Sequence, residues 1–236
     1  MSHSFKLVLA PAKRLLSRVL GRHKIARTRR YPPSGTSVTA FFESTTKARV
    51  NMVVLRWFDA LPRVEAGEDI DILVADADLE KIAPLLHTWE GDVPVDLYTV
   101  SGLPGTQYKH GSYLPAALAE AVLKGRVMKD KLFPHPSAID HFDSMAYHAV
   151  FHKGPRSGLP SRSVARLDEV PEHDYAEELE LLRKKLQIDV AITLEGLAEY
   201  LTAKGYRPTP AALAKLRKGN TWIEGYYFGA PAEAGR

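Results

Sequence analysis

Three short apolar runs in the first hundred residues have the composition and spacing of β-strands. They are rich in Val, Ile and Leu and lie at residues 51–58 (NMVVLRWF), 69–75 (DIDILVA) and 93–100 (VPVDLYTV). Helical spacing appears at residues 77–87, and again after Ser37, which is placed to cap a helix. The pattern therefore predicts a small sheet with helices packed on it.

Most of the next fifty residues have the three- and four-residue spacing of helices. One helix is expected at 112–124, followed by a hairpin near 127–133. Ser137, with Asp140 three residues later, predicts the capped start of a long helix that ends at Gly154.

Gly, Pro, Ser and Arg dominate residues 154–171, which are expected to be a connection. Three further helical segments follow, at 172–187, 193–204 and 209–218. Because the strands come first and the helices after them, the predicted fold class is α+β, with a small mixed sheet and a helical C-terminal region.

A Tyr-Pro-Pro-Ser-Gly break at residues 31–35 suggests where the folded body begins. The predicted divisions are a basic N-terminal tail at 1–33, a core at 34–155 and the helical C-terminal region at 156–236.

The charge of the chain is concentrated at one end. The net charge is +4, but residues 1–30 hold nine Lys and Arg and no acid, so residues 31–236 carry −5. Nucleic-acid-binding domains usually place their positive charge on a folded face. The mildly acidic body therefore argues against a nucleic-acid partner.

Within this tail, apolar residues alternate with arginines at helical spacing. A short basic amphipathic helix at residues 11–30 suits an anionic membrane surface, and the alternative is a solvated extension. The chain has no cysteine and no apolar run long enough for a membrane span. We therefore expect a cytoplasmic protein, with peripheral contact at the inner membrane as the tail's role.

The segment GEDIDILV, residues 67–74, carries the most specific chemistry. Side chains alternate along a strand, so Asp69 and Asp71 project from the same face. Two ionised carboxylates this close repel each other unless a cation joins them. Carboxylate oxygens suit Mg²⁺ or Mn²⁺, with phosphate oxygens completing the coordination, and Gly67 leaves backbone room just before the strand.

A third acid, Asp96, lies in the middle of the next predicted strand. If that strand lies beside the first, Asp96 joins Asp69 and Asp71 at one metal cluster of the kind that in-line phosphoryl or nucleotidyl transfer needs. The alternative is two exposed acids on an edge strand and one acid paired with a buried arginine.

These segments resemble a known superfamily. A strand VVLR, then GEDIDILV about ten residues later, a helix and then VPVDLY are similar to the nucleotidyltransferases typified by DNA polymerase β, and among them to bacterial uncharacterised nucleotidyltransferases. The resemblance covers about residues 38–155. It implies a nucleotidyltransferase-like core, two divalent metals bound by Asp69, Asp71 and Asp96, and a position for Asp96 near the nucleophile.

The sequence departs from that superfamily at one point. A Gly-Ser pair usually precedes the D-x-D strand and binds the triphosphate, whereas this chain has Leu55-Arg56-Trp57. Arg56 is a candidate replacement, since a guanidinium forks well onto phosphate. Two further candidates for phosphate contact are Lys109, which precedes a predicted helix, and Lys153, which lies at the end of another. The histidines of that second helix are expected to pack against neighbouring residues.

The expected function is therefore metal-dependent transfer of a nucleotidyl group from an NTP to a small-molecule, glycan or protein acceptor. Two alternatives stay open. One is a catalytically degenerate scaffold that binds a partner or a membrane, and the other is a nuclease that uses the same acids.

Overall fold

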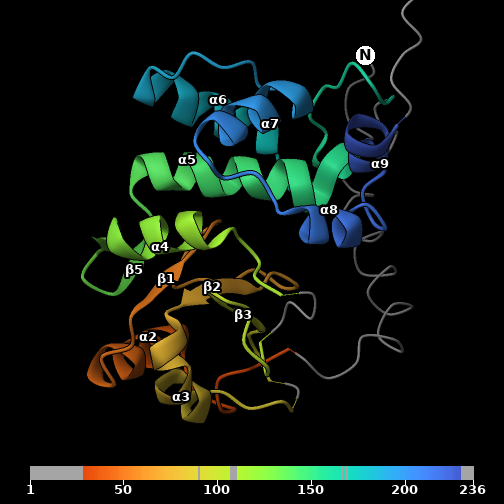
Figure 1. Cartoon of the computed structure of the whole chain (residues 1–236). Coiled ribbons are helices and arrows are strands. Elements are labelled where there is room, and N and C mark those ends of the chain that lie inside the picture. Colours follow the sequence, from red (N-terminus) through yellow and green to blue (C-terminus); the bar gives the residue numbers. More distant parts are fainter. Residues whose placement is uncertain (1–28, 90, 107–110, 166, 168–169, 230–236) are drawn as a thin grey trace, which may run out of the picture.

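The computed structural model describes residues 29–89, 91–106, 111–165, 167 and 170–229. A three-stranded mixed sheet lies at its centre (Figure 1), formed by β1 (Met52–Val54), β2 (Ile70–Val74) and β3 (Val95–Thr99). The strand order is β1-β2-β3, with β1 antiparallel and β3 parallel to β2. The fold class is α+β, as the order of strands and helices predicted.

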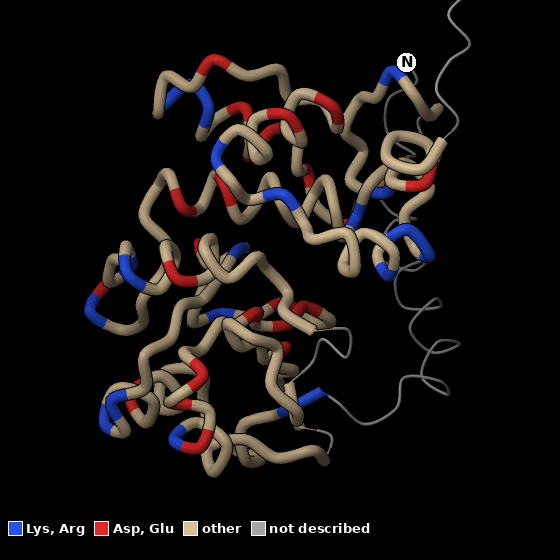
Figure 2. Tube along the Cα trace, viewed as in Figure 1, with Lys and Arg blue, Asp and Glu red and all other residues tan. Residues whose placement is uncertain are grey.

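The sheet is buried on both faces because its apolar side chains alternate between two cores. Met52, Val54 and Ile72 pack with α2 (Val38–Lys47) on one side. Val53 and Leu73 pack on the other side, under α4 (Ala116–Lys124) and the helices beyond it (Figure 1). Several acidic positions lie at the sheet, between α2 on one side and α4 on the other (Figure 2).

The crossover from β2 to β3 is less regular than the helix predicted at 77–87. It consists of a 3₁₀ turn at Asp76–Asp78, the short helix α3 (Leu79–Ile82) and a second 3₁₀ turn at Ala83–Leu85. Pro84 lies in the second turn, and proline cannot donate the backbone hydrogen bond that a continuing α-helix needs.

The end of the predicted tail belongs to the folded body. The backbone N–H of Arg30 donates to the carbonyl oxygen of Val95 at 3.2 Å, and Val95 N–H donates back at 2.8 Å. Tyr31 exchanges the same pair of bonds with His87, both at 2.9 Å. Arg30, within the range predicted as tail, therefore extends the edge of the sheet at β3.

The rest of the predicted membrane-binding helix lies outside the described residues, which begin at Arg29. Within the described part of the chain, no helix is both long and apolar enough to cross a membrane.

A hairpin and one long helix connect the sheet to the C-terminal half. Strands β4 (Val127–Lys129) and β5 (Phe133–His135) form the predicted hairpin. Helix α5 (Ala138–Tyr147) begins as expected, with Asp140 N–H donating to the Ser137 hydroxyl at 3.3 Å. It continues as a π-helical turn at His148–Lys153 and ends at Gly154. Helix α4 starts later than the predicted residue 112, because Pro115 disfavours helical backbone in the residue before it.

Four helices follow in the described residues: α6 (Tyr175–Leu186), α7 (Leu194–Ala203), α8 (Pro210–Leu216) and α9 (Thr221–Phe228). Helices α6 and α7 pack on α5, and α9 packs on the 3₁₀ turn at Gly154–Ser157. Helix α9 was not predicted. Its Trp222 is buried, whereas Phe228 is 42% exposed. Asn220 caps this helix and also donates to the carbonyl oxygens of Val150 and Phe151 in the π-helical turn.

Candidate functional site

A cleft of about 290 Å³ opens between the sheet and the C-terminal helices. The acids of β2 and β3 lie on its sheet side, after Gly67, whose φ of +99° favours glycine. The π-helical turn supplies His148, His152 and Lys153 on the opposite side. The cleft therefore combines residues from both halves of the chain.

The three predicted carboxylates converge in this cleft. Parallel pairing of β2 with β3 sets Asp71 directly opposite Asp96, so that both side chains leave the same face of the sheet. One oxygen each from Asp69, Asp71 and Asp96 lies within 4.8 Å of the others. The convergence predicted from strand alternation is thus confirmed.

Burial disfavours the negatively charged forms of Asp71 and Asp96. Desolvation raises the pKa of Asp71 to about 7, although the charge of Arg56 opposes it and that of Asp69 adds to it. Desolvation likewise raises the pKa of Asp96 to about 6, with a further contribution from Asp69. A cation at these oxygens would favour the ionised forms, so the cluster could hold one.

We expect the acids to make stability depend on pH. Their folded-state pKa values lie above the unfolded value near 3.8, so their stabilising contribution is complete below that pH and is lost as pH rises through about 6–7. Asp71→Asn should reduce the difference in unfolding free energy between pH 5 and pH 8 by about 1–2 kcal/mol. Urea titrations at both pH values measure this, with the exposed Asp92→Asn as control. An unchanged difference in Asp71→Asn would contradict the raised pKa.

Arg56 lies in the cleft, as predicted, but its partner there is an acid. Its Nη2 donates to Asp71 Oδ1 at 2.6 Å, and the guanidinium carbon lies 5.4 Å from the centre of the Tyr113 ring. The Arg56 side chain is only 9% exposed. The arrangement is that of a buried ion pair, which leaves Arg56 less free to bind phosphate.

The predicted strand at 51–58 is too long, and this changes the face that Arg56 occupies. Alternation placed Arg56 on the side of Val54, but Val54 packs in the core on the α2 side of the sheet. The strand ends at Val54, and the chain turns at Trp57, whose φ is +53°. That turn brings Arg56 to the cleft.

Arg29 also reaches the acids, which the sequence did not reveal. Its Nη2 forms an ion pair with Asp69, and its Nε lies 3.3 Å from Asp96 Oδ1. The residue was expected to be part of the tail. Its position just before the Tyr-Pro-Pro break was the only signal that the folded body might begin there.

Tyrosines and histidines form the wall behind the acids. Tyr98 donates its hydroxyl to Asp71 Oδ1 at 3.1 Å and stacks on Tyr113, with ring centres 4.0 Å apart. The Tyr113 hydroxyl is hydrogen-bonded to His148 Nδ1. The other ring nitrogen of His148 lies 3.1 Å from the Tyr175 hydroxyl. Burial holds the pKa of His148 well below its usual range, so this wall is uncharged near neutral pH.

The rim of the cleft carries a second group of possible ligands. Donor atoms of Glu68, Glu172 and His173 lie within 4.8 Å of one another, and His173 stacks on Trp57 at 4.2 Å. Lys153 lines the cleft and lies 3.4 Å from Glu172 Oε2. The remaining predicted phosphate contact, Lys109, lies outside the described residues.

Comparison of the chain with protein-family models, with curated proteins and with solved structures found no match. The functional argument therefore depends on the geometry of the cleft.

Proposed function

We propose that this protein is a metal-dependent nucleotidyltransferase that transfers a nucleotidyl group from an NTP to a hydroxyl or phosphate of a small-molecule, glycan or protein acceptor. One observation carries the proposal: three carboxylates from two adjacent strands meet in a cleft that also holds basic side chains. The small mixed sheet that positions them, with β1 antiparallel and β3 parallel to β2, supports a nucleotidyltransferase-like core.

The donor set fits a hard divalent cation. Carboxylate oxygens of Asp69, Asp71 and Asp96, all within 4.8 Å of one another, are the ligands that Mg²⁺ and Mn²⁺ prefer. When bound there, the cation would neutralise phosphate charge and help to orient the NTP for in-line displacement.

Residues of this chain would supply the general base, the phosphate contacts and the space for the substrate. Asp96 is the candidate to accept the proton of the attacking hydroxyl, because its carboxylate lies in the cluster at which that hydroxyl would be activated. Lys153 is the candidate for phosphate contact from the helical side, and Lys109 remains a second. Gly67 leaves room for a substrate at the entrance of the acid-bearing strand.

A catalytically degenerate scaffold is the second candidate. The observation that favours it is that arginines are paired with all three acids: Arg29 with Asp69 and Asp96, and Arg56 with Asp71. Such a cluster is stable without a cation, and the basic N-terminal segment would then serve a partner or an anionic membrane.

A thermal-shift experiment separates the two candidates. Mg²⁺ with an NTP at about 100 times its Kd should stabilise an enzyme of this size by about 2.7 kcal/mol, which is a rise of about 5–10 °C in Tm. Asp69→Asn should abolish this rise, measured from the variant's own Tm, whereas Asp92→Asn outside the cleft should keep it. No rise with any of the four NTPs, with Mg²⁺ or Mn²⁺, would contradict the enzyme and support the scaffold.

A further inference from the structure

We infer that Arg29 is an internal competitor for the cation site, so that a divalent cation binds the acids only when the Arg29 guanidinium leaves them. This inference rests on the proposed function and concerns the regulation of the same cleft. Its starting point is that Arg29 is ion-paired with two of the three acids, Asp69 and Asp96.

The backbone explains why Arg29 arrives at this place. Arg30 is hydrogen-bonded in both directions to Val95, the residue before Asp96 on β3. Tyr31 is anchored in the same way to His87. Because the bridge between Arg30 and Val95 is antiparallel, Arg29 lies opposite Asp96. The contact between Arg29 and Asp96 is therefore set by the register of this pairing.

The two arginines of the site differ in how readily they can leave. The Arg56 side chain is 9% exposed, lies over the Tyr113 ring and pairs with the buried Asp71. The Arg29 side chain is 34% exposed, and its partners Asp69 and Asp96 are 25% and 14% exposed. Water can solvate Arg29 as it withdraws, so it is the arginine that a cation can displace.

Charge balance favours exchange over joint occupancy. When ionised, the three acids carry −3, which Arg56 reduces to −2, the charge that a single divalent cation neutralises. With Arg29 also in place the remaining charge is only −1. A guanidinium and a divalent cation on the same two carboxylates would repel each other at short range. Arg29 therefore weakens cation binding for as long as it stays.

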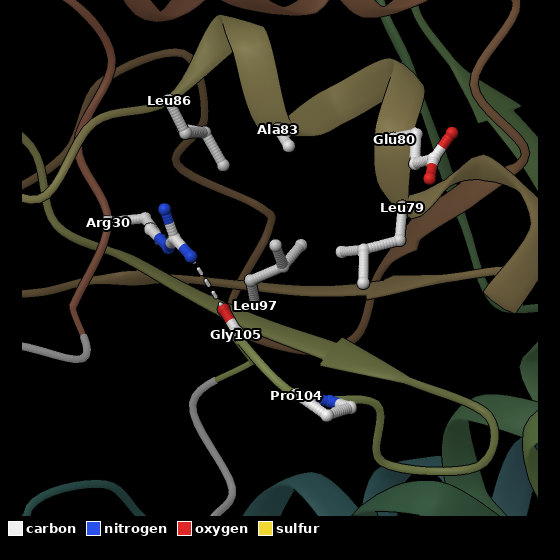
Figure 3. Close-up of a pocket in the computed structure, with 8 residues that line it drawn as sticks. All are labelled: Arg30, Leu79, Glu80, Ala83, Leu86, Leu97, Pro104 and Gly105. Atoms are coloured by element: carbon white, nitrogen blue, oxygen red, sulfur yellow. Dashed lines mark hydrogen bonds between the residues drawn. The ribbon is translucent and has the colours of Figure 1, made fainter.

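The neighbouring Arg30 provides a matched control. Its guanidinium donates to the Gly105 carbonyl oxygen at 2.9 Å (Figure 3). It lines a separate pocket of about 220 Å³ with Leu86, Leu97 and other apolar residues (Figure 3). Arg30→Ala thus removes one positive charge next to Arg29 without touching the cluster.

The test is Mn²⁺ binding to the full chain, measured by electron paramagnetic resonance and by calorimetry without nucleotide. Arg29→Ala should bind Mn²⁺ about five- to tenfold more tightly than the unchanged protein. Arg29→Lys, which keeps the charge but loses the fork, should fall between the two. Arg30→Ala should match the unchanged protein.

Unchanged or weaker Mn²⁺ binding in Arg29→Ala would overturn the inference, as would equal tightening in Arg30→Ala. Asp69→Asn separates this failure from that of the proposed function. If Asp69→Asn abolishes binding and Arg29→Ala has no effect, the cation site stands and only the competition is wrong. If neither the unchanged protein nor Arg29→Ala binds Mn²⁺, both fail.

Discussion

Replacing Arg56 with alanine is expected to lower the free energy of unfolding by about 3–5 kcal/mol at pH 8, because it leaves a buried carboxylate without its partner. Asp71 is only 4% exposed, and Arg56 donates to it at 2.6 Å. The loss should shrink at pH 5, where Asp71, with a pKa of about 7, is protonated. Urea denaturation at the two pH values measures both effects.

Two controls show whether the ion pair causes this loss. Arg63→Ala, at an arginine whose side chain is 78% exposed, should change stability by no more than about 0.5 kcal/mol. Asp71→Asn in the Arg56→Ala background should recover part of the loss, since it removes the unpaired charge. A full additive loss in the double variant would show that packing on Tyr113, not charge, makes Arg56 important.

Arg56→Lys distinguishes the structural role of Arg56 from the phosphate contact suggested by the sequence. A phosphate clamp would lose NTP affinity by about 1–3 kcal/mol with stability little changed. The buried pair with Asp71 instead predicts lower stability with NTP affinity retained.

Gly154→Ala is expected to destabilise the protein by about 3–5 kcal/mol through two separate causes. Gly154 has φ +55° and ψ −131°, a conformation that residues with a Cβ strongly disfavour. A Cβ there would also lie 2.1 Å from Asn220 Oδ1, and Asn220 is 2% exposed. Thermal or urea unfolding measures the loss.

Gly205→Ala is the matched comparison for Gly154→Ala. Gly205 also has a positive φ, of +78°, but a Cβ there meets no atom within 4 Å. Gly205→Ala should therefore cost about 1 kcal/mol, the backbone part alone. Equal losses at the two glycines would mean that Asn220 yields and that the junction with α9 is less rigid than its packing indicates.

Local patterns were sufficient to find the acids but not Arg29. Alternation along a strand is a property of neighbouring residues, so Asp69 and Asp71 could be placed on one face from GEDIDILV alone. Placing Asp96 beside them needed only the assumption that the next strand is parallel, which the register confirms. Arg29 depends on a pairing between residues 30 and 95, and no local pattern encodes a contact of that separation.

On the helical side of the cleft the sequence predicted Lys153 but not the two histidines beside it, for a related reason. His148 and His152 were expected to pack, and they do, against Tyr113 and Tyr175. That the same rings line a cleft follows from how α5 lies over the sheet, which is a property of the tertiary packing. Similarly, the face of Arg56 depends on the turn at Trp57, a residue type that rarely adopts positive φ.

The π-helical turn decides which side chains of the helical wall face the cleft. In a regular α-helix, residues five apart differ in direction by about 140°, so His148 and Lys153 would point to different sides. The wider turn at 148–153, with its i→i+5 hydrogen bonds, brings both to the cleft. If the same six residues formed a regular α-helix, Lys153 would rotate away from the acids while His148 stayed in place. Deleting one residue between them would instead leave His148 and Lys153 four positions apart, about 40° in direction, so both would still face the cleft. The π-helical turn therefore accommodates one extra residue while keeping its basic side chain opposite the acids.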